Sequence, residues 1–187
     1  SLLNTAELSR STKIAQTTLQ RYLSLLQTIF LVRLVPAWYS NLGKRLQKSP
    51  KVFVTDYGLM AYLQGLNEAS LKAELGLPGS LVEAFVFAEL TKHQGWAEET
   101  AELLHYRTTT GVEVDFVLEN RRQEVVGIEV KAAATVVAKD LNGLKHLRKT
   151  VGDKFKRGIL LYTGDQLVNF DENLVAVPIS IFWQANI

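Results

Sequence analysis

Four residues in the second half of the chain have types that could act together on a phosphodiester. Glu83 falls in a predicted helix, Asp115 in a predicted strand, and Glu129 and Lys131 share one face of the next predicted strand. Carboxylates gathered among apolar strands are costly to bury unless a cation neutralises them. The pattern therefore predicts a nuclease-type acidic cluster of these four residues, whether or not it still cuts.

A hard divalent cation, Mg²⁺ or Mn²⁺, suits such a cluster. Magnesium takes one or two carboxylates and otherwise keeps water and substrate phosphate as ligands. We expect Asp115 and Glu129 to be the metal ligands, helped by the carbonyl oxygen of Val130, with Lys131 beside the attacking water or the scissile phosphate. The ion would lower the pKa of that water and stabilise charge on the phosphoryl oxygens, so the predicted reaction is phosphodiester hydrolysis.

Each of these residues also has an ordinary explanation. Glu129 and Lys131 could form a surface ion pair on a half-exposed strand, and Asp115 could begin a turn. Ser80 and Glu83 fit a capping box, in which the serine accepts from a backbone amide and the glutamate reaches back to the cap. Against that, Glu83 shares its helix face with apolar residues and so points toward the sheet that this face covers.

The elements expected to position the cluster form an α/β unit over residues 80–187. A helix from 80 to about 93 opens it after Pro78-Gly79, and alternation places Glu113 and Asp115 on one face of a strand. The expected strands are 103–108, 112–118, 124–131, 158–162 and 175–178, and a second covering helix is expected over 140–150.

The first 79 residues predict a winged-helix-like region with a connecting helix. Two helices, 5–12 and 16–30, precede two strands, 31–35 and 51–54. In the second helix, apolar residues recur at three- and four-residue spacing and predict a face turned to the core. These residues are Leu19, Leu23, Leu26 and Phe30, with Tyr22 beside them.

Charge is divided unevenly between the two units. Residues 1–79 hold nine Lys and Arg against four Asp and Glu, a net of +5, whereas residues 80–187 hold twelve against fifteen, a net of −3. A basic winged helix can place a recognition helix in the DNA major groove, and it can equally be a protein-docking module. The residues expected near DNA are Arg10, Lys13, Gln20, Arg21, Lys44, Arg45 and Lys48.

Composition narrows the class of protein. Hydrophobic residues at 47% and charged residues at 21% are typical of a folded globular chain. The absence of cysteine excludes disulfides and thiolate metal sites, and the three histidines lack the paired spacing of a zinc site. Charges interrupt every apolar stretch before membrane-spanning length, so we expect a cytoplasmic protein with no membrane partner.

The order of the four chemical residues resembles a known nuclease core. A helical Glu83, a strand Asp115 and then Glu129-x-Lys131 fourteen residues later is similar to the PD-(D/E)XK arrangement across residues 80–161. This resemblance implies a restriction-endonuclease-like mixed sheet flanked by helices.

A second resemblance runs nearly end to end. It is carried by NLGKR at 41–45, KSPKV at 48–52, DYGL at 56–59, GVEVDF at 111–116 and IEVK at 128–131. Together these segments resemble the C-terminal domain of unknown function that follows the ATPase module in many bacterial and archaeal AAA-type P-loop ATPases. The resemblance implies that such a protein consists of an ATPase module, followed by a winged helix and then by a nuclease-like domain.

This family resemblance has further implications for the residues and partners. Arg107 and Glu113 match family positions of no assigned task, and Glu89 matches one that we interpret as structural. The sequence contains no G-x-x-x-x-G-K-[S/T] loop, so we expect a fragment whose partner is the P-loop ATPase module of the same protein. ATP is then a cofactor only through that module.

The sequence is therefore consistent with three functions. The first is an ATPase-attached region that contacts nucleic acid and cleaves it with magnesium. The second is a non-catalytic docking module of the ATPase, in which the acidic cluster is inherited structure. The third, a DNA-binding regulator, is disfavoured because it leaves the acidic cluster unexplained.

Overall fold

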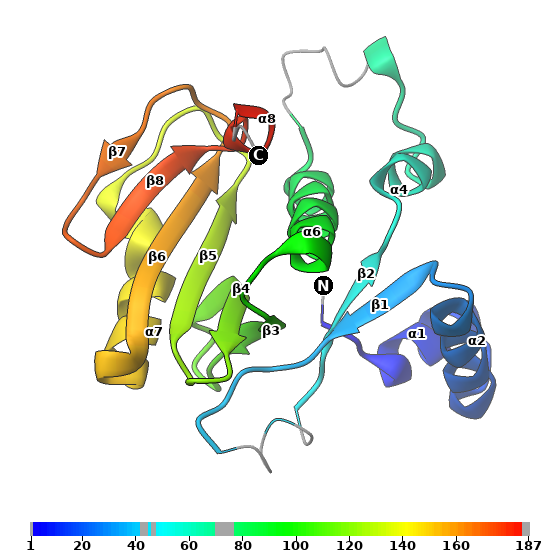
Figure 1. The fold of residues 1–187 in the computed structure, drawn as a ribbon. Coiled ribbons are helices and arrows are strands. Elements are labelled where there is room, and N and C mark those ends of the chain that lie inside the picture. Colours follow the sequence, from blue (N-terminus) through cyan, green and yellow to red (C-terminus); the bar gives the residue numbers. More distant parts are fainter. Residues whose placement is uncertain (1, 42–44, 46–47, 70–76, 185–187) are drawn as a thin grey trace.

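A six-stranded mixed sheet is the centre of the larger part of the molecule in the computed structural model, which describes residues 2–41, 45, 48–69 and 77–184. Its strands run in the order β3-β4-β5-β6-β8-β7 (Figure 1). Their bounds are β3 Ala101–Arg107, β4 Glu113–Asn120, β5 Val125–Lys131, β6 Phe155–Tyr162, β7 Val168–Asn169 and β8 Leu174–Pro178. The first three strands form an antiparallel meander, and β5, β6 and β8 are parallel. The expected mixed α/β sheet is confirmed.

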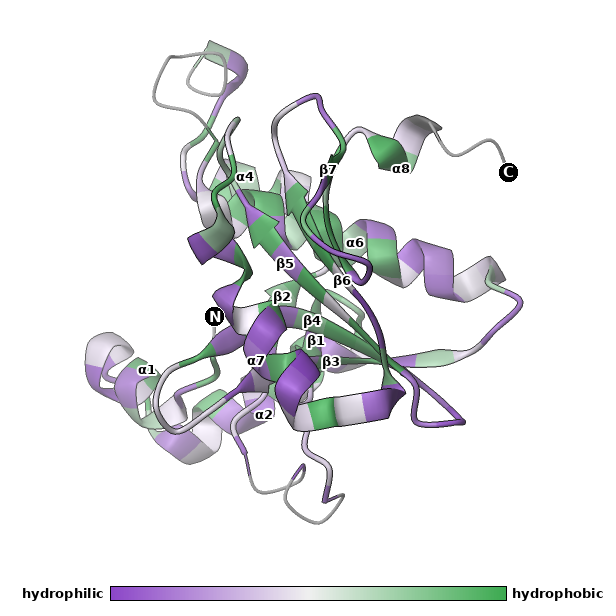
Figure 2. Ribbon diagram, turned by 90° about the vertical axis from the view of Figure 1, so that its left-hand side faces the viewer, coloured by the Kyte–Doolittle hydropathy of each residue, from purple (hydrophilic) through white to green (hydrophobic). Residues whose placement is uncertain are grey.

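Helices cover both faces of this sheet. One face carries α6 (Gly79–Trp96), and the other carries α7 (Asn142–Val151), which follows the 3₁₀ turn η1 (Ala138–Leu141). The outward side of α7 is coloured largely hydrophilic in Figure 2, whereas the strands behind it are largely hydrophobic. The last helix, α8 (Ile181–Gln184), is short. Within the described residues, the helices are too short or too polar to cross a membrane.

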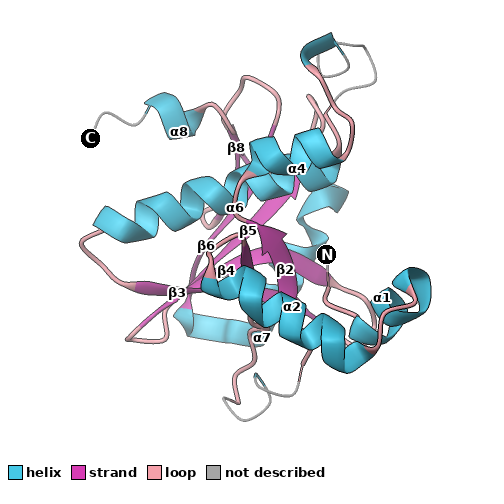
Figure 3. Ribbon diagram, turned by 90° about the vertical axis from the view of Figure 1, so that its right-hand side faces the viewer, coloured by secondary structure: helices cyan, strands magenta, loops and turns pink. Residues whose placement is uncertain are grey.

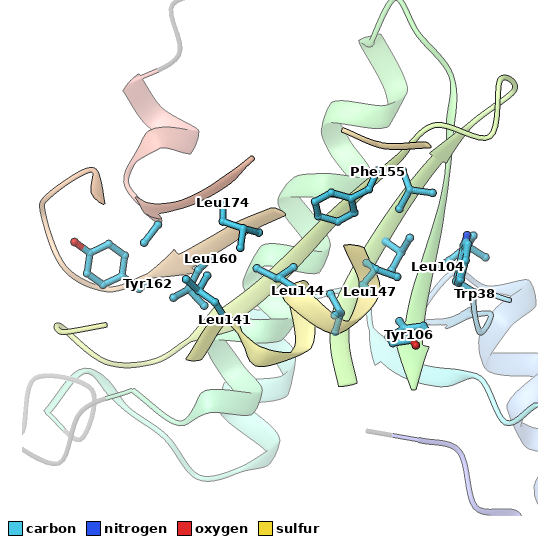
Figure 4. Packing of buried hydrophobic residues seen from close by; sticks show 14 residues of the cluster. Trp38, Leu104, Tyr106, Leu141, Leu144, Leu147, Phe155, Leu160, Tyr162 and Leu174 are labelled. Atoms are coloured by element: carbon cyan, nitrogen blue, oxygen red, sulfur yellow. The ribbon is translucent and has the colours of Figure 1, made fainter. Parts of the chain in front are cut away.

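Two apolar layers lie against the two faces of the sheet. Figure 4 shows the layer under α7, which comprises Trp38, Leu104, Tyr106, Val114, Val117, Val125, Leu141, Leu144, Leu147, Phe155, Leu160, Tyr162, Leu174 and Ala176. The layer under α6 comprises Val35, Phe53, Val82, Val86, Phe87, Leu90, Leu103, Phe116, Ile128, Leu161, Val175, Val177 and Ile179.

Close packing of α7 depends on a glycine. A Cβ atom added at Gly143 would lie 2.1 Å from the carbonyl oxygen of Glu113. The first turn of α7 therefore touches the backbone at the start of β4, which only glycine permits. This contact fixes α7 against the strand that carries Asp115.

The N-terminal part consists of a helix pair and a two-stranded hairpin. Its elements are α1 (Thr5–Thr12), α2 (Gln16–Thr28), β1 (Val32–Val35), β2 (Lys51–Val54) and α4 (Tyr57–Leu63). β1 and β2 pair antiparallel, and Phe53 of β2 stacks on Phe87 of α6 with ring centroids 4.4 Å apart. Because Val35 and Phe53 belong to the layer under α6, the predicted units 1–79 and 80–187 share one core.

One expectation about the N-terminal part is wrong. The predicted core-facing side of α2 is not buried: no residue of α1 or α2 is buried, Leu19 and Leu23 are half-buried, and Leu26 is exposed. Figures 1 and 3 place α1 and α2 together beside β1, on the far side of the hairpin from the six-stranded sheet. Periodicity identified an apolar face correctly, but among the described residues nothing covers most of it. The winged-helix assignment stays a prediction.

Candidate functional site

Three of the predicted site residues converge around a lysine that the sequence did not single out. Lys51 of β2 donates a hydrogen bond to Glu83 Oε1 of α6 at 2.7 Å and to Asp115 Oδ1 of β4 at 2.8 Å. Glu129 of β5 is close enough for both Asp115 and Lys51 to influence its ionisation. The fold therefore brings Glu83, Asp115 and Glu129 together as expected, and adds Lys51.

Asp115 owes its position to a β-bulge. Tyr106 pairs with Val114 and Leu104 pairs with Val117, so two residues of β4 lie opposite one of β3. The expected regular alternation along β4 is consequently wrong: Val114 belongs to the layer under α7 although Phe116, two residues on, belongs to the layer under α6. Bulges redirect single side chains in this way.

Glu83 does not cap α6; its side chain extends from the helix toward Lys51. The capping box proposed for Ser80 and Glu83 does not form, because the helix begins one residue earlier, at Gly79, with Pro78 as its N-cap and no side-chain cap. Glu83 then lies within the second turn and binds Lys51. The alternative explanation of Glu83 as a cap residue is therefore wrong.

Lys51 is a buried cation with only 4% of its surface exposed. Burial lowers the pKa of Lys51, but Asp115 and Glu83 outweigh burial, and the pKa lies above its ordinary value. Lys51 is therefore charged at neutral pH. Alternation in β2 holds a signal for it, since Lys51 and Phe53 share the buried face of that strand.

Glu129 has the opposite electrostatic character. Burial, together with the nearby negative charge of Asp115, raises its pKa to about 9, although Lys51 and a hydrogen bond from the Asp115 backbone amide act against this. Its Oε2 atom is buried and has no hydrogen-bond partner. At neutral pH the carboxyl of Glu129 is consequently uncharged.

Lys131 directs its ammonium group away from the cluster. Its Nζ lies 2.6 Å from Asp140 Oδ1, and Asp140 Oδ2 accepts a second hydrogen bond from the Val137 backbone amide. This ion pair joins the end of β5 to η1. The structure does not bring Lys131 into the group formed by Glu83, Asp115 and Lys51.

The arrangement does not fit a divalent metal ion as it stands. Asp115 Oδ1 accepts a hydrogen bond from Lys51, and Asp115 Oδ2 accepts one from the backbone N–H of Val130 at 3.0 Å. Among the carboxyl oxygens of the described residues, only Glu129 Oε2 is buried without a hydrogen-bond partner. Over the part of the chain that the structure describes, no three His, Cys, Asp or Glu side chains are grouped to hold a metal. The predicted ligand pair of Asp115 and Glu129 therefore needs Lys51 to move before it can bind metal.

The three other acidic or basic residues matched by the family resemblance have local partners. Arg107 and Glu113 form an ion pair between β3 and β4. Glu89 pairs with Lys92 one turn along α6, at 2.6 Å. These contacts give each residue a structural explanation.

The described residues predicted to approach DNA lie in two regions, the helix pair α1–α2 and the connection between β1 and β2. The guanidinium of Arg45 is committed to Glu119, with N–O distances of 2.5 and 2.9 Å, and lies over the Trp38 ring. Lys48 lies over the ring of Tyr39. The exposed members, from α1, its C-cap and α2, are Arg10, Lys13, Gln20 and Arg21. Lys44 lies outside the described residues.

Family models match both parts of the chain. A model described as "Domain of unknown function (DUF4143)" matches residues 78–182, more than half of the chain. A model described as "Domain of unknown function (DUF8612)" matches residues 1–70. The border between the matches falls within residues 71–77, close to the boundary expected at residue 79.

Similar proteins exist among curated sequences and solved structures. Uncharacterized proteins of Mycobacterium bovis and Mycobacterium tuberculosis are each 30% identical over 178 residues, which cover 95% of this chain and 38% of each relative. The chain thus spans well under half the length of these relatives. A half-complex of Thermococcus gammatolerans McrB AAA+ hexamers with bound McrC is similar with a TM-score of 0.40 and 9% identity, over 85% of this chain and 59% of that chain. A likeness this low carries no argument.

Proposed function

This chain belongs to the DUF4143 family, and we propose that it serves as the docking module of an AAA-type P-loop ATPase within a longer protein. The ATPase follows from the family resemblance of the sequence motifs. The length of the mycobacterial relatives, of which the chain spans 38%, leaves room for such a module.

The observation that carries this proposal is an exposed apolar stripe on α2. Tyr22, Leu25, Leu26 and Ile29 follow the spacing i, i+3, i+4, i+7, and 50, 61, 37 and 60% of their respective surfaces are exposed. Single exposed leucines are ordinary on protein surfaces, whereas a contiguous apolar stripe on one helix marks an interaction site. We name this set the α2 stripe.

A protein surface suits the α2 stripe better than DNA does. The helix carries one charged residue, Arg21, and phosphate contacts need several cations. An amphipathic helix that lays its apolar residues into a groove of a partner is a common recognition mode. The partner proposed here is the ATPase module of the same protein, with an apolar groove that receives the stripe.

The test is a binding titration between this chain and the separately produced ATPase module, followed by calorimetry. Leu25→Asp places a charge in the stripe, and Ser24→Asp places the same charge on the neighbouring residue outside it. We expect Leu25→Asp to weaken binding at least tenfold and Ser24→Asp to bind like the wild type. Equal binding by both variants, no binding by the wild type, or self-association through the stripe would refute the proposal.

A second candidate function is metal-dependent phosphodiester hydrolysis at the acidic cluster. The buried Oε2 atom of Glu129, which has no hydrogen-bond partner and belongs to a carboxyl next to Asp115, favours it, because a bound ion is one explanation for a buried polar atom without a partner. Titration of Mg²⁺ or Mn²⁺ by calorimetry, on the wild type and Glu129→Ala, tests it together with DNA cleavage on the same samples. Binding that Glu129→Ala removes, with cleavage that Asp115→Ala abolishes, would support the nuclease. Absence of both would exclude hydrolysis by the cluster while Lys51 is bound to Asp115.

A further inference from the structure

Lys51 has the geometry of a cation held in a site. Its Nζ atom lies 2.7 Å from Glu83 Oε1 and 2.8 Å from Asp115 Oδ1, two oxygens that come from different elements. The lysine is almost fully buried, so the two carboxylates rather than water are the main partners of its ammonium group. An ammonium group that bridges two carboxylates in such surroundings supplies the positive charge that the cluster requires.

The β1–β2 hairpin holds this ammonium group in place. Lys51 pairs with Val35 across the hairpin, and Leu2 forms a further bridge to the Lys51 backbone. Val35 and Phe53, on either side of the hairpin, are fixed in the apolar layer under α6. The position of the lysine therefore depends on the packing of the N-terminal part against α6.

Occupation by Lys51 leaves few oxygens for another cation. Each oxygen of Asp115 already accepts a hydrogen bond, one from Lys51 and one from the Val130 amide. Among the described carboxyl oxygens of the cluster, Glu129 Oε2 is the one that is buried without a hydrogen-bond partner. A divalent ion bound to Asp115 and Glu129 would also lie within a few ångströms of the ammonium, and repulsion between like charges at that distance opposes binding.

We propose that the ammonium group of Lys51 is the resident cation of the Glu83–Asp115–Glu129 cluster, and that it and a divalent metal ion occupy the cluster in mutually exclusive states. The nuclease-like site is thus closed by a residue of the N-terminal part. A metal site forms only when Lys51 leaves. This inference does not depend on the docking function, because none of its residues belongs to α2.

Titration of Mn²⁺ alone, followed by calorimetry and thermal melting, tests the proposal. Lys51→Met removes the ammonium and keeps an unbranched side chain one atom shorter, and we expect it to bind Mn²⁺ at least tenfold more tightly than the wild type. Adding Asp115→Asn to Lys51→Met should abolish the gain. Lys131→Met is the matched control: it removes a lysine paired with Asp140 outside the cluster and should behave like the wild type.

Because Lys51→Met leaves two partly buried carboxylates without their cation, the experiment includes a replacement for a variant that does not fold. In that event Lys51→Met/Glu83→Gln, which removes one positive and one negative charge, takes its place and retains Asp115 and Glu129. Tight Mn²⁺ binding by either folded variant, with little by the wild type, supports the proposal. Equal binding by wild type and variant, or none by a folded variant, overturns it.

Discussion

At the scale of single residues, burial sets the charges in and around the cluster. His105 is 1% exposed, and its Nε2 lies 3.2 Å from the carbonyl oxygen of Ser49. Burial, reinforced by the nearby charge of Lys51, lowers the pKa of His105 to about 4. The imidazole therefore stays neutral in the folded protein at neutral pH, with Nε2–H as the donor to Ser49.

This pKa predicts a pH dependence of stability. Between pH 6.5 and about 4 the unfolded chain binds a proton at this histidine and the folded chain does not, so acid favours unfolding. Stability from His105 is complete above pH 6.5 and declines as pH falls, by roughly 3 kcal/mol at the limit. Urea unfolding across this range should show a steeper acid loss for wild type than for His105→Gln.

The charge state of His105 is tested by the difference between the pH profiles of stability of the wild type and His105→Gln. The raised pKa of Glu129 acts in the other direction, since its folded form keeps a proton from about pH 4.5 to about 9 that the unfolded form releases. Glu129 is present in both proteins, so its effect cancels in the comparison. Parallel pH profiles for wild type and His105→Gln would contradict the assigned state of His105.

The acidic residues of the cluster could be predicted from the sequence, but their cation could not. Glu83, Asp115 and Glu129 lie on three predicted elements of one unit, so their order suggested that they meet. Lys51 lies 32 residues from Glu83 and 64 from Asp115, in the other predicted unit. Local patterns contain no information about contacts over such separations, and the alternation of Lys51 with Phe53 in β2 did not enter the prediction.

At the scale of elements, periodicity predicted the helices and strands well and their partners less well. The 5–12 helix is as expected, and the expected meander appears as β3, β4 and β5. The bulge at Asp115 was missed because alternation assumes a regular ladder. The α2 face was misassigned because an amphipathic pattern does not say what covers the apolar side.

The close approach of α7 to β4 predicts that replacing a glycine by alanine has very different effects on stability at two positions. Gly143→Ala should destabilise the protein by about 1–3 kcal/mol or more, since its Cβ meets the Glu113 carbonyl at 2.1 Å. Gly95→Ala, in a helix position with nothing within 4 Å of the added Cβ, should be neutral or slightly stabilising. Chemical denaturation compares them, and similar losses for both would argue against the tight α7–β4 contact.

The loss of stability on replacing a leucine by alanine should likewise differ between α7 and α2. Leu144 of α7 is fully buried, so Leu144→Ala should cost about 2–5 kcal/mol by leaving a cavity. Leu25 of α2 is 61% exposed, and Leu25→Ala should change the free energy of unfolding by less than about 0.5 kcal/mol. Thermal or urea unfolding of the isolated chain decides this. A large loss for Leu25→Ala would mean that the α2 stripe is covered within the chain itself.

At the scale of the whole molecule, the hairpin connects two regions with different exposures. On one side it contributes Val35 and Phe53 to the core under α6 and Lys51 to the acidic cluster. On the other side it carries the helix pair whose stripe is exposed (Figure 3). A partner that binds α2 therefore contacts the element next to the hairpin that supplies Lys51 to the acidic cluster.

The central claim, that the ATPase module covers the α2 stripe, is tested most directly by amide hydrogen exchange. Exchange would be followed in this chain with and without the ATPase module, for residues 16–28 of α2 and, as an internal reference, residues 142–151 of α7. Packing against a partner raises protection of a helix that is otherwise free to open. We predict slower exchange in α2 and unchanged exchange in α7 when the module is added. Unchanged exchange in α2 when the ATPase module is present in excess over this chain would contradict the docking function.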